Sequence, residues 1–184
     1  MYIFAHILIF IMKILILFAH PAYEKSRVNK RILEGIEGIE DVTLHDLYES
    51  YPEFDIDIKK EQELLTEHDC IIFQFPFFWY STPAILKEWQ DLVLEHGWAY
   101  GSKGNALEGK LFLTVLTTGG PKSAYTSEGY QHYTLLELLA PIRQTGHLCK
   151  MVPIPPFAVH GTHAISDQDL KEHKNKYHML LTLI

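Results

Sequence analysis

The sequence predicts an α/β fold with a doubly wound, five-stranded parallel sheet in the order 2-1-3-4-5. Five apolar runs of strand length alternate with stretches whose hydrophobic residues recur at helical spacing. This alternation is typical of a parallel sheet with helices on both faces. Ligands bind such sheets at the carboxyl edge of the strands, near the switch between strands one and three. The turns at that edge are therefore the candidate binding loops.

The expected strands are the five apolar runs, at residues 13–18, 42–47, 69–74, 110–116 and 147–154. The expected helices have apolar residues three and four positions apart: one behind Ser26, then 59–67, 84–95, 133–139 and 166–183. Pro141 is expected to end the fourth helix. Consecutive prolines at 155 and 156 are expected to carry the chain out of the sheet, because proline has no N–H for the ladder. Trp89 is expected in the core.

Three aromatic residues, Tyr48, Tyr51 and Phe54, fit neither helical nor strand spacing. Pro52 breaks any helix among them. They are expected to anchor a long loop. A more specific hypothesis is that they contact a second subunit.

Composition and charge limit the possible functions. The chain has 184 residues with 47% hydrophobic content, which suits one domain, placed at residues 12–184. A formal charge of −7 without a basic run argues against nucleic-acid binding, because phosphates require a basic face. Cys70 and Cys149 lie in apolar runs and are expected to be buried free thiols, as suits a reducing cytoplasm. His160 and His163 form the closest histidine pair, but no further ligand fits a metal pattern, so no metal site is expected.

The amino terminus is ambiguous, because only His6 and Lys13 interrupt an apolar run of nineteen residues. That length would suit a membrane helix. No basic residue precedes the run, however, and residues 13–19 are needed as the first strand because the His20-Pro21 turn follows directly. Residues 1–11 are therefore expected to be an extension, with a membrane anchor as the alternative.

Three loops carry the candidate chemistry. The turn after the first strand leads to a helix capped by Ser26, an arrangement that favours phosphate, although an ordinary capped turn is the alternative. The aromatic residues at 75–80 can stack on a flat ring. Hydroxyls and backbone amides at 117–120 can hydrogen-bond the edge of that ring. A phosphate cradle, an aromatic wall and edge donors are together what a flavin requires.

The segment QFPFFWYSTPAILKEW, followed by TTGG, resembles the flavin-dependent NAD(P)H:quinone oxidoreductases of flavodoxin-like fold. Within that family, HDLYESYPEFDID, HGWAYG and PPFAVHG resemble the bacterial ancillary oxidoreductases of glutathione-gated potassium efflux systems. The resemblance implies FMN, with FAD as the alternative, NAD(P)H as co-substrate and a quinone or similar acceptor. It also implies a homodimer and a cytoplasmic location, or a peripheral one at the inner face of the cell membrane.

The resemblance assigns roles residue by residue. Phosphate and ribityl contacts fall on His20, Ser26, Arg27, Val28 and Asn29. The flavin platform falls on Pro76, Phe77, Phe78 and Trp79. The edge donors fall on Thr117, Thr118, Gly119 and Gly120.

Tyr125 falls at the family position that faces the ring across the hydride-transfer pocket, although a packed loop aromatic is the alternative. In the best-known quinone reductases a histidine follows this tyrosine by six residues, whereas here Gln131 stands there and His132 comes next. Either His132 substitutes through a shifted backbone or Tyr125 works without it.

Three functions fit this pattern. The first is a quinone oxidoreductase in which nicotinamide and quinone use one pocket in turn. The second is a flavin-binding regulatory subunit of a potassium efflux transporter. A flavodoxin-like electron carrier ranks last, because TTGG-PKSAY and the Trp79 loop resemble a substrate pocket.

Overall fold

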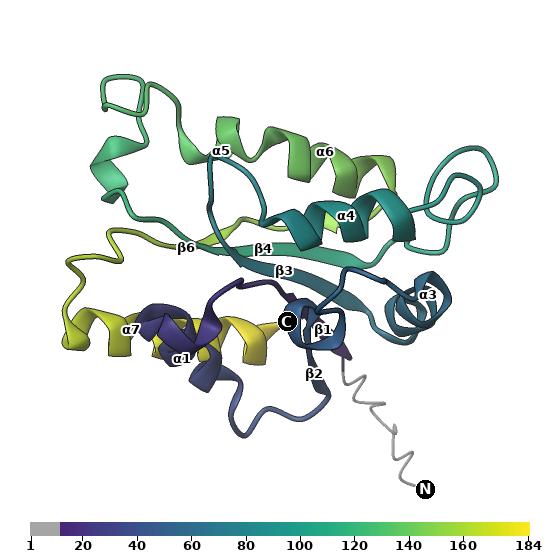
Figure 1. Ribbon diagram of the computed structural model, residues 1–184, viewed down its shortest axis with the longest axis horizontal. Helices are drawn as coiled ribbons and strands as arrows, with labels where there is room; N and C mark the ends of the chain where they lie inside the picture. Colours follow the sequence, from purple (N-terminus) through teal and green to yellow (C-terminus); the bar gives the residue numbers. More distant parts are fainter. Residues whose placement is uncertain (1–11) are drawn as a thin grey trace, which may run out of the picture.

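A parallel sheet forms the centre of the computed structural model, which describes residues 12–184 (Figure 1). Its strands are β1 (Ile14–Phe18), β2 (Val42–Asp46), β3 (Cys70–Pro76), β4 (Leu111–Thr117), β5 (Val152–Pro153) and β6 (Phe157–Val159). The strands pair in the order β2-β1-β3-β4-β5, and β6 pairs with β4. All these pairings are parallel. The predicted fold class and strand order are confirmed, with β6 added.

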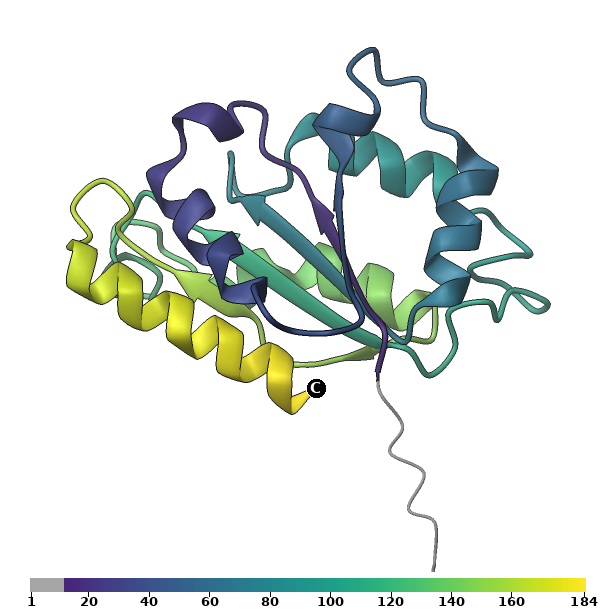
Figure 2. The same ribbon diagram turned by 90° about the horizontal axis from the view of Figure 1, so that it is seen from below.

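Helices cover both faces of the sheet. The α-helices are α1 (Arg27–Leu33), α2 (Leu47–Ser50), α3 (Ile58–Glu67), α4 (Ala84–Val93), α5 (Leu135–Leu138), α6 (Ala140–Leu148) and α7 (Asp167–Leu183). Short 3-10 turns are η1 (Tyr23–Lys25), η2 (Glu34–Ile36) and η3 (Lys122–Ala124). Figure 1 shows α4, α5 and α6 on one face, with α1 and α7 on the other. Seen from below in Figure 2, α1 and α7 lie side by side on the near side of the sheet and run roughly along the strands.

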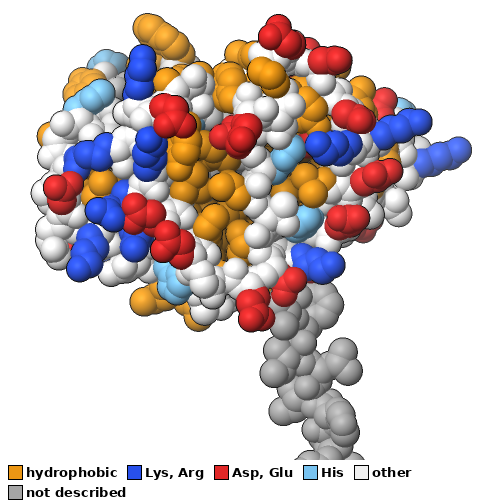
Figure 3. Space-filling model, turned by 60° about the horizontal axis from the view of Figure 1, so that its bottom comes forward, with side chains coloured by type: hydrophobic (Ala, Val, Ile, Leu, Met, Phe, Trp, Pro, Cys, Tyr) orange, Lys and Arg blue, Asp and Glu red, His pale blue; other side chains and the backbone are white. Residues whose placement is uncertain are grey.

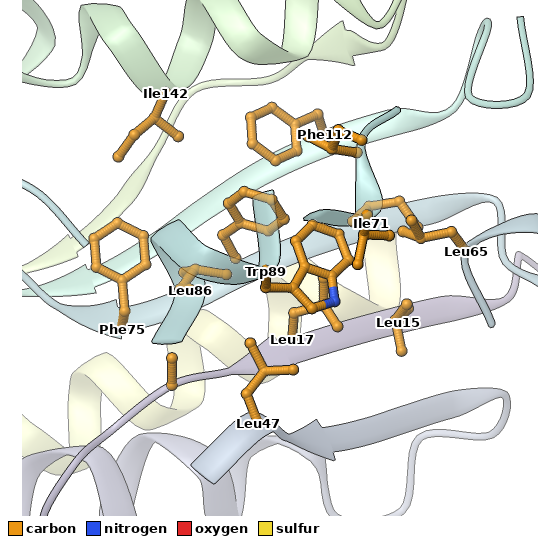
Figure 4. Packing of buried hydrophobic residues seen from close by; sticks show 14 of the residues in the cluster. Leu15, Leu17, Leu47, Leu65, Ile71, Phe75, Leu86, Trp89, Phe112 and Ile142 are labelled. Carbon is orange, nitrogen blue, oxygen red and sulfur yellow. The ribbon is translucent and has the colours of Figure 1, made fainter. Parts of the chain in front are cut away.

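The buried strands supply two hydrophobic clusters, one on each face. Successive side chains of a strand point to opposite faces, so Leu15 and Leu17 join one cluster while Ile14 and Ile16 join the other. In the first cluster the indole of Trp89 lies among strand residues (Figure 4), and it is completely buried. This two-sided burial explains why the strands are almost continuously apolar, and it confirms Trp89 as a core residue.

The fifth strand is not the continuous segment that was predicted. His147 and Leu148 belong to α6, and Cys149 follows as its cap rather than lying in a strand. The strand itself is reduced to β5, two residues long. The chain leaves the sheet at the two prolines, which cannot donate to the ladder, and then returns as β6 to pair with the end of β4. The predicted exit was right, but the return was missed.

Pro141 begins a helix instead of ending one. It lies in the first turn of α6, where backbone N–H groups have no helical partner and proline's missing donor costs nothing. The preceding turn, α5, is a separate short helix that starts with a capping box at Thr134 and Glu137. The helix expected at 133–139 therefore begins later, at Leu135, and it ends at Leu138, before Pro141 is reached.

The loop that precedes α3 is anchored through a buried carboxylate. Glu61 accepts hydrogen bonds from the Tyr51 hydroxyl at 2.5 Å, the Trp89 indole at 2.8 Å and the His45 ring at 2.8 Å. Burial acts to raise the pKa of Glu61, but these three partners outweigh it and lower the pKa. Tyr48 and Phe54 pack edge to face at the same loop. Tyr51 thus anchors the loop as expected, whereas Tyr48 belongs to the short helix α2 and Phe54 is exposed. The subunit contact stays a prediction.

The surface carries charges of both signs. On the face displayed in Figure 3, basic and acidic side chains are interspersed around a hollow that contains hydrophobic side chains. Cys70 and Cys149 are free and buried, as predicted. Among residues 12–184, no helix is long and apolar enough to cross a membrane. The expected extension at residues 1–11 lies outside the described part of the chain.

Candidate functional site

A cavity of about 470 Å³ opens where the carboxyl ends of β1, β3 and β4 meet. Its walls come from the three loops that the sequence singles out, together with the segment after β6. The lining residues are His20, Ala22, Lys25, Ser26, Arg27, Val28, Asn29, Pro76, Phe77, Phe78, Thr117, Gly119, Thr162 and His163. The structure thus brings together most of the residues predicted to hold a flavin.

The first wall is the turn between β1 and α1. The Ser26 side chain caps α1 and accepts hydrogen bonds from the backbone N–H of Asn29 at 3.2 Å and from its side-chain amide at 2.9 Å. Asn29 is only 3% exposed, and its Oδ1 has no hydrogen-bond partner among the described residues. A buried polar atom without a partner is costly. The residue that carries this acceptor lines the cavity.

Two cations belong to the same wall, but they are arranged differently. The guanidinium of Arg27 pairs with Asp167 and also donates to the carbonyl of Ile165, so it is engaged with the start of α7. Lys25 also lines the cavity and is exposed. The sequence did not single out Lys25, although it lies in the loop that the sequence analysis named.

His20 completes this wall. Its Nδ1 accepts a hydrogen bond from the backbone N–H of Ala22 at 3.1 Å, so the neutral ring carries its proton on Nε2. Burial lowers the pKa of His20. His20 is therefore a neutral donor at pH 7, with its ring edge-on to Phe78 at 6.4 Å.

The second wall is aromatic. Pro76, Phe77 and Phe78 line the cavity, and the backbone N–H of Phe77 donates to the carbonyl of Thr117 at 2.9 Å, so the second and third walls are joined. Trp79 is not with them. It is 92% exposed and has a positive φ of 48°. The predicted stacking role of Trp79 remains a prediction, and the described chain leaves this ring in solvent.

The third wall is the turn after β4. Thr117 points its hydroxyl toward the side-chain amide of Asn29, at 3.4 Å. Gly119 lies close to the segment after β6, since a Cβ there would be 3.0 Å from Nε2 of His163. Thr118 turns away from the cavity: its hydroxyl donates to the carbonyl of Gly120 at 2.9 Å, and its N–H donates to the carbonyl of Val159. Thr118 thus has no free donor for a ring edge.

Tyr125 lies in a neighbouring cavity of about 440 Å³ rather than in the first one. That cavity is lined by Lys122, Tyr125, Leu135, Pro156, Ala158, His160 and His173. Burial raises the pKa of Tyr125. A Cβ on Gly120 would come within 3.4 Å of the Tyr125 ring, so the two cavities are separated by the turn at Gly120.

His132 does not lie beside Tyr125. It is exposed and has a positive φ of 62°, and none of the hydrogen bonds or ring contacts found in residues 12–184 joins it to Tyr125. The ring next to Tyr125 is that of His160, with centroids 5.4 Å apart. The histidine pair noted in the sequence is therefore divided, with His160 at the Tyr125 cavity and His163 at the first cavity.

The fold and the site define a class of protein: a doubly wound parallel sheet with a ligand-sized cavity at the switch between β1 and β3. A family model described as "Flavodoxin-like fold" matches residues 12–181. The chain belongs to this family.

Relatives with more specific names share most of the chain. It is 44% identical over 166 residues to the uncharacterized NAD(P)H oxidoreductase YdeQ of Bacillus subtilis, covering 90% of this chain and 84% of YdeQ. It is also 44% identical over 165 residues to the ancillary protein KefG of the glutathione-regulated potassium-efflux system of Serratia proteamaculans, covering 90% of both chains.

Two solved structures are similar over nearly their whole length. General stress protein 14 of Treponema denticola, in complex with FMN, has a TM-score of 0.88 and 36% identity, covering 93% of this chain and 98% of that one. A protein of P. pentosaceus described as an NADPH-quinone reductase has a TM-score of 0.86 and 32% identity, covering 94% and 99%.

Proposed function

We propose that this protein is an FMN-dependent NAD(P)H:quinone oxidoreductase that transfers two electrons by hydride transfer. The observation that carries the proposal is the cavity at the three loop ends, lined by buried Asn29, whose Oδ1 has no partner among the described residues. The relatives described above as an NAD(P)H oxidoreductase, an NADPH-quinone reductase and an FMN complex support the same chemistry.

The residues present fit FMN. A volume of about 470 Å³ lies in the range of small-molecule sites. Lys25 and the free N–H groups at the start of α1 suit a phosphate, while Phe77 and Phe78 suit a flat ring. Gly119 allows the backbone to approach that ring closely. FMN is proposed over FAD because of the FMN complex of the Treponema denticola protein.

Bound FMN would supply the hydride-accepting and hydride-donating ring that connects NAD(P)H to a quinone. The chain's own residues bind and orient. Thr117 and the backbone amides of Gly119 and Gly120 are proposed as donors to the ring edge where negative charge develops. His20, neutral and holding a proton on Nε2, is proposed as a donor to the ribityl phosphate. Thr118 supports the turn, because both of its donors are used within the protein.

Tyr125 is proposed to border the place where the substrates react. Its cavity adjoins the turn at Gly120. Its hydroxyl is protonated at neutral pH, as an ordinary tyrosine is, and burial raises its pKa further. Nicotinamide and quinone must each stack on the same ring for hydride transfer, so they are proposed to alternate in one site.

A homodimer is proposed to complete this site. Phe78, which lines the first cavity, is exposed together with Trp79 and Tyr80, which follow it in the chain. Tyr130 and Tyr133, a few residues after Tyr125, are exposed as well. Exposed aromatic side chains gathered in this way mark a contact surface. A second copy would cover them and narrow both cavities.

Absorption spectroscopy of the purified protein tests the cofactor assignment directly. We expect the flavin bands near their usual wavelengths, release of FMN on heating, and quenching of FMN fluorescence on rebinding. Steady NADPH oxidation that depends on an added soluble quinone tests the activity. Colourless protein that neither quenches FMN nor FAD would remove the flavin proposal.

A second candidate function rests on the similarity to KefG. In that case the protein docks on a potassium efflux transporter from the cytoplasm, and the flavin site serves regulation. The two functions can coexist in one protein. Two experiments separate the two functions. The first tests whether the tagged protein copurifies with an efflux transporter, and the second measures potassium efflux in cells that lack this protein.

A further inference from the structure

The segment after β6 is hydrogen-bonded along the turn that follows β4. The backbone N–H of Thr118 donates to the carbonyl of Val159 at 2.9 Å, that of Gly161 to the carbonyl of Gly120 at 2.9 Å, and that of Thr162 to the carbonyl of Thr118 at 3.1 Å. The turn proposed to donate to the flavin edge therefore takes its shape from residues 159–162.

His160 adds a side-chain bond to this backbone frame. Its Nδ1 lies 3.0 Å from the hydroxyl oxygen of Thr118. That hydroxyl has one hydrogen, and it already donates to the carbonyl of Gly120 at 2.9 Å. Both bonds can exist together only if Nδ1 of His160 is the donor. The neutral ring must then carry its proton on Nδ1 and leave Nε2 unprotonated.

The same imidazole contacts Tyr125. The two ring centroids lie 5.4 Å apart with an interplanar angle of 41°, and both residues line one cavity. His160 therefore connects the two parts of the proposed site: the turn at the first cavity through Thr118, and the tyrosine of the second cavity through ring packing.

We propose that His160 is a positioning residue for hydride transfer, which holds the turn at residues 117–120 through Thr118 and sets the ring of Tyr125. It takes the place beside the tyrosine that the sequence suggested for His132. The inference rests on the proposed function for its catalytic consequence, but the bond from His160 to Thr118 can be tested in protein without flavin.

The charged and titratable groups around His160 determine when it titrates. Lys122 from η3 and His173 from α7 face it across the Tyr125 cavity, and on its other side a cavity is also lined by Asp169, Glu172 and Lys176. Burial, followed by Lys122 and His173, lowers the pKa of His160. His160 is therefore neutral at pH 7, and acidification adds a proton at Nε2 while the Nδ1 bond persists.

Two substitutions separate the hydrogen bond from the ring contact. In His160→Asn the side-chain N–H can replace Nδ1, so the bond to Thr118 is kept and the ring is lost. In His160→Phe the ring is kept and the bond is lost. The matched control is His147→Asn, because His147 is an exposed histidine on α6. His132→Ala tests the competing assignment.

The first measurement uses nitrogen NMR of the full-length protein freed of flavin. We expect His160 to show the Nδ1–H tautomer at pH 7 and to titrate below pH 6.5. The amide signals of Gly119 and Gly120 should follow that titration, stay near their positions in His160→Asn and shift in His160→Phe. An Nε2–H tautomer, or glycine signals that ignore His160 in all variants, would overturn the proposal whether or not flavin binds.

The second measurement is stopped-flow reduction of the FMN-loaded protein by NADPH. We expect His160→Phe to be slower by about tenfold, the loss of one hydrogen bond of about 1.4 kcal/mol, with unchanged FMN affinity. His160→Asn should retain more of the rate than His160→Phe. Titration of His160 should make the rate of flavin reduction depend on pH below pH 6.5. This pH dependence should disappear in both variants and persist in His147→Asn. A large loss of the reduction rate in His132→Ala, together with full activity in His160→Phe, would show that His132 and not His160 is the positioning residue.

Discussion

The side-chain amide of Asn29 lies 3.4 Å from the hydroxyl of Thr117, although 88 residues separate them in the chain. The contact joins the start of α1 to the end of β4, and it leaves Oδ1 of Asn29 without a partner among the described residues. The contact thereby fixes the distance between the first and the third wall of the cavity. A ligand that reaches both walls would bind without having to order them first.

Replacing Ser26 and Asn29 together with alanine should weaken FMN binding by about 1–3 kcal/mol, the usual loss for hydrogen bonds to a charged group. Fluorescence titration measures this change. Because Ser26 also caps α1, the double variant loses helix stability as well. Ser166→Ala is the matched control, since Ser166 caps α7 in the same way and does not line the cavity. Equal affinities for the double variant and the wild type would place the phosphate elsewhere.

Changing Tyr125 to phenylalanine should slow flavin reduction by about tenfold, near 1.4 kcal/mol, while FMN affinity stays the same. A hydroxyl that stabilises charge only as the hydride moves affects the rate and not ground-state binding. Stopped-flow reduction at saturating NADPH measures that step. Tyr100→Phe, in the loop between α4 and β4 and in the lining of neither cavity, should leave it unaltered. An unchanged rate in Tyr125→Phe would make Tyr125 a packing residue.

Steady-state kinetics with varied NADPH and quinone should follow a ping-pong scheme. Each substrate must stack on the same face of the ring, so they exclude one another from the pocket. Double-reciprocal plots are therefore expected to be parallel, and high quinone should inhibit competitively against NADPH. Lines that intersect would show both substrates bound together, and the shared site would have to be abandoned.

Sedimentation at micromolar concentration should show that the protein is a homodimer. Its interface is expected to bury more than about 1,000 Å². Trp79→Ala should shift the equilibrium toward monomer, because this ring is 92% exposed in the single chain. Met179→Ala, at an exposed apolar residue of α7, is the control and should sediment as the wild type does. A fully active monomer at the same concentration would exclude the shared interface.

Glu61→Gln should lower the free energy of unfolding by about 1–3 kcal/mol at pH 7, because an amide cannot accept from Tyr51, Trp89 and His45 together. Urea unfolding measures the change, with the exposed Glu63→Gln of the same helix as control. The pKa of Glu61 is lowered in the fold, so its stabilisation is present above the ordinary pKa and disappears as pH falls through the folded value. The difference between wild type and variant should therefore shrink below about pH 4. A difference that stays constant down to pH 3 would mean that the fold does not lower the pKa of Glu61.

The sequence alone determined the sheet and the position of its ligand edge. Runs such as ILILF and CIIFQF are typical of strands buried on both faces of a parallel sheet, and the turn residues behind such strands collect at one edge. The positions of the turn after β1, the aromatic wall and Thr117 follow from that topology, because each is attached directly to the end of a strand. Local sequence is sufficient where the backbone leads straight from a strand into the site.

The tertiary structure decided what the side chains do once they reach that edge. Trp79 follows Phe78 directly, but a backbone with positive φ turns it into solvent. The Thr118 hydroxyl is hydrogen-bonded to Gly120 and His160. His160, and not His132, packs against Tyr125. The return of β6 beside β4 makes these contacts possible. Pairing between segments some forty residues apart depends on the packing of the whole sheet, and no local pattern around Tyr125 encodes it.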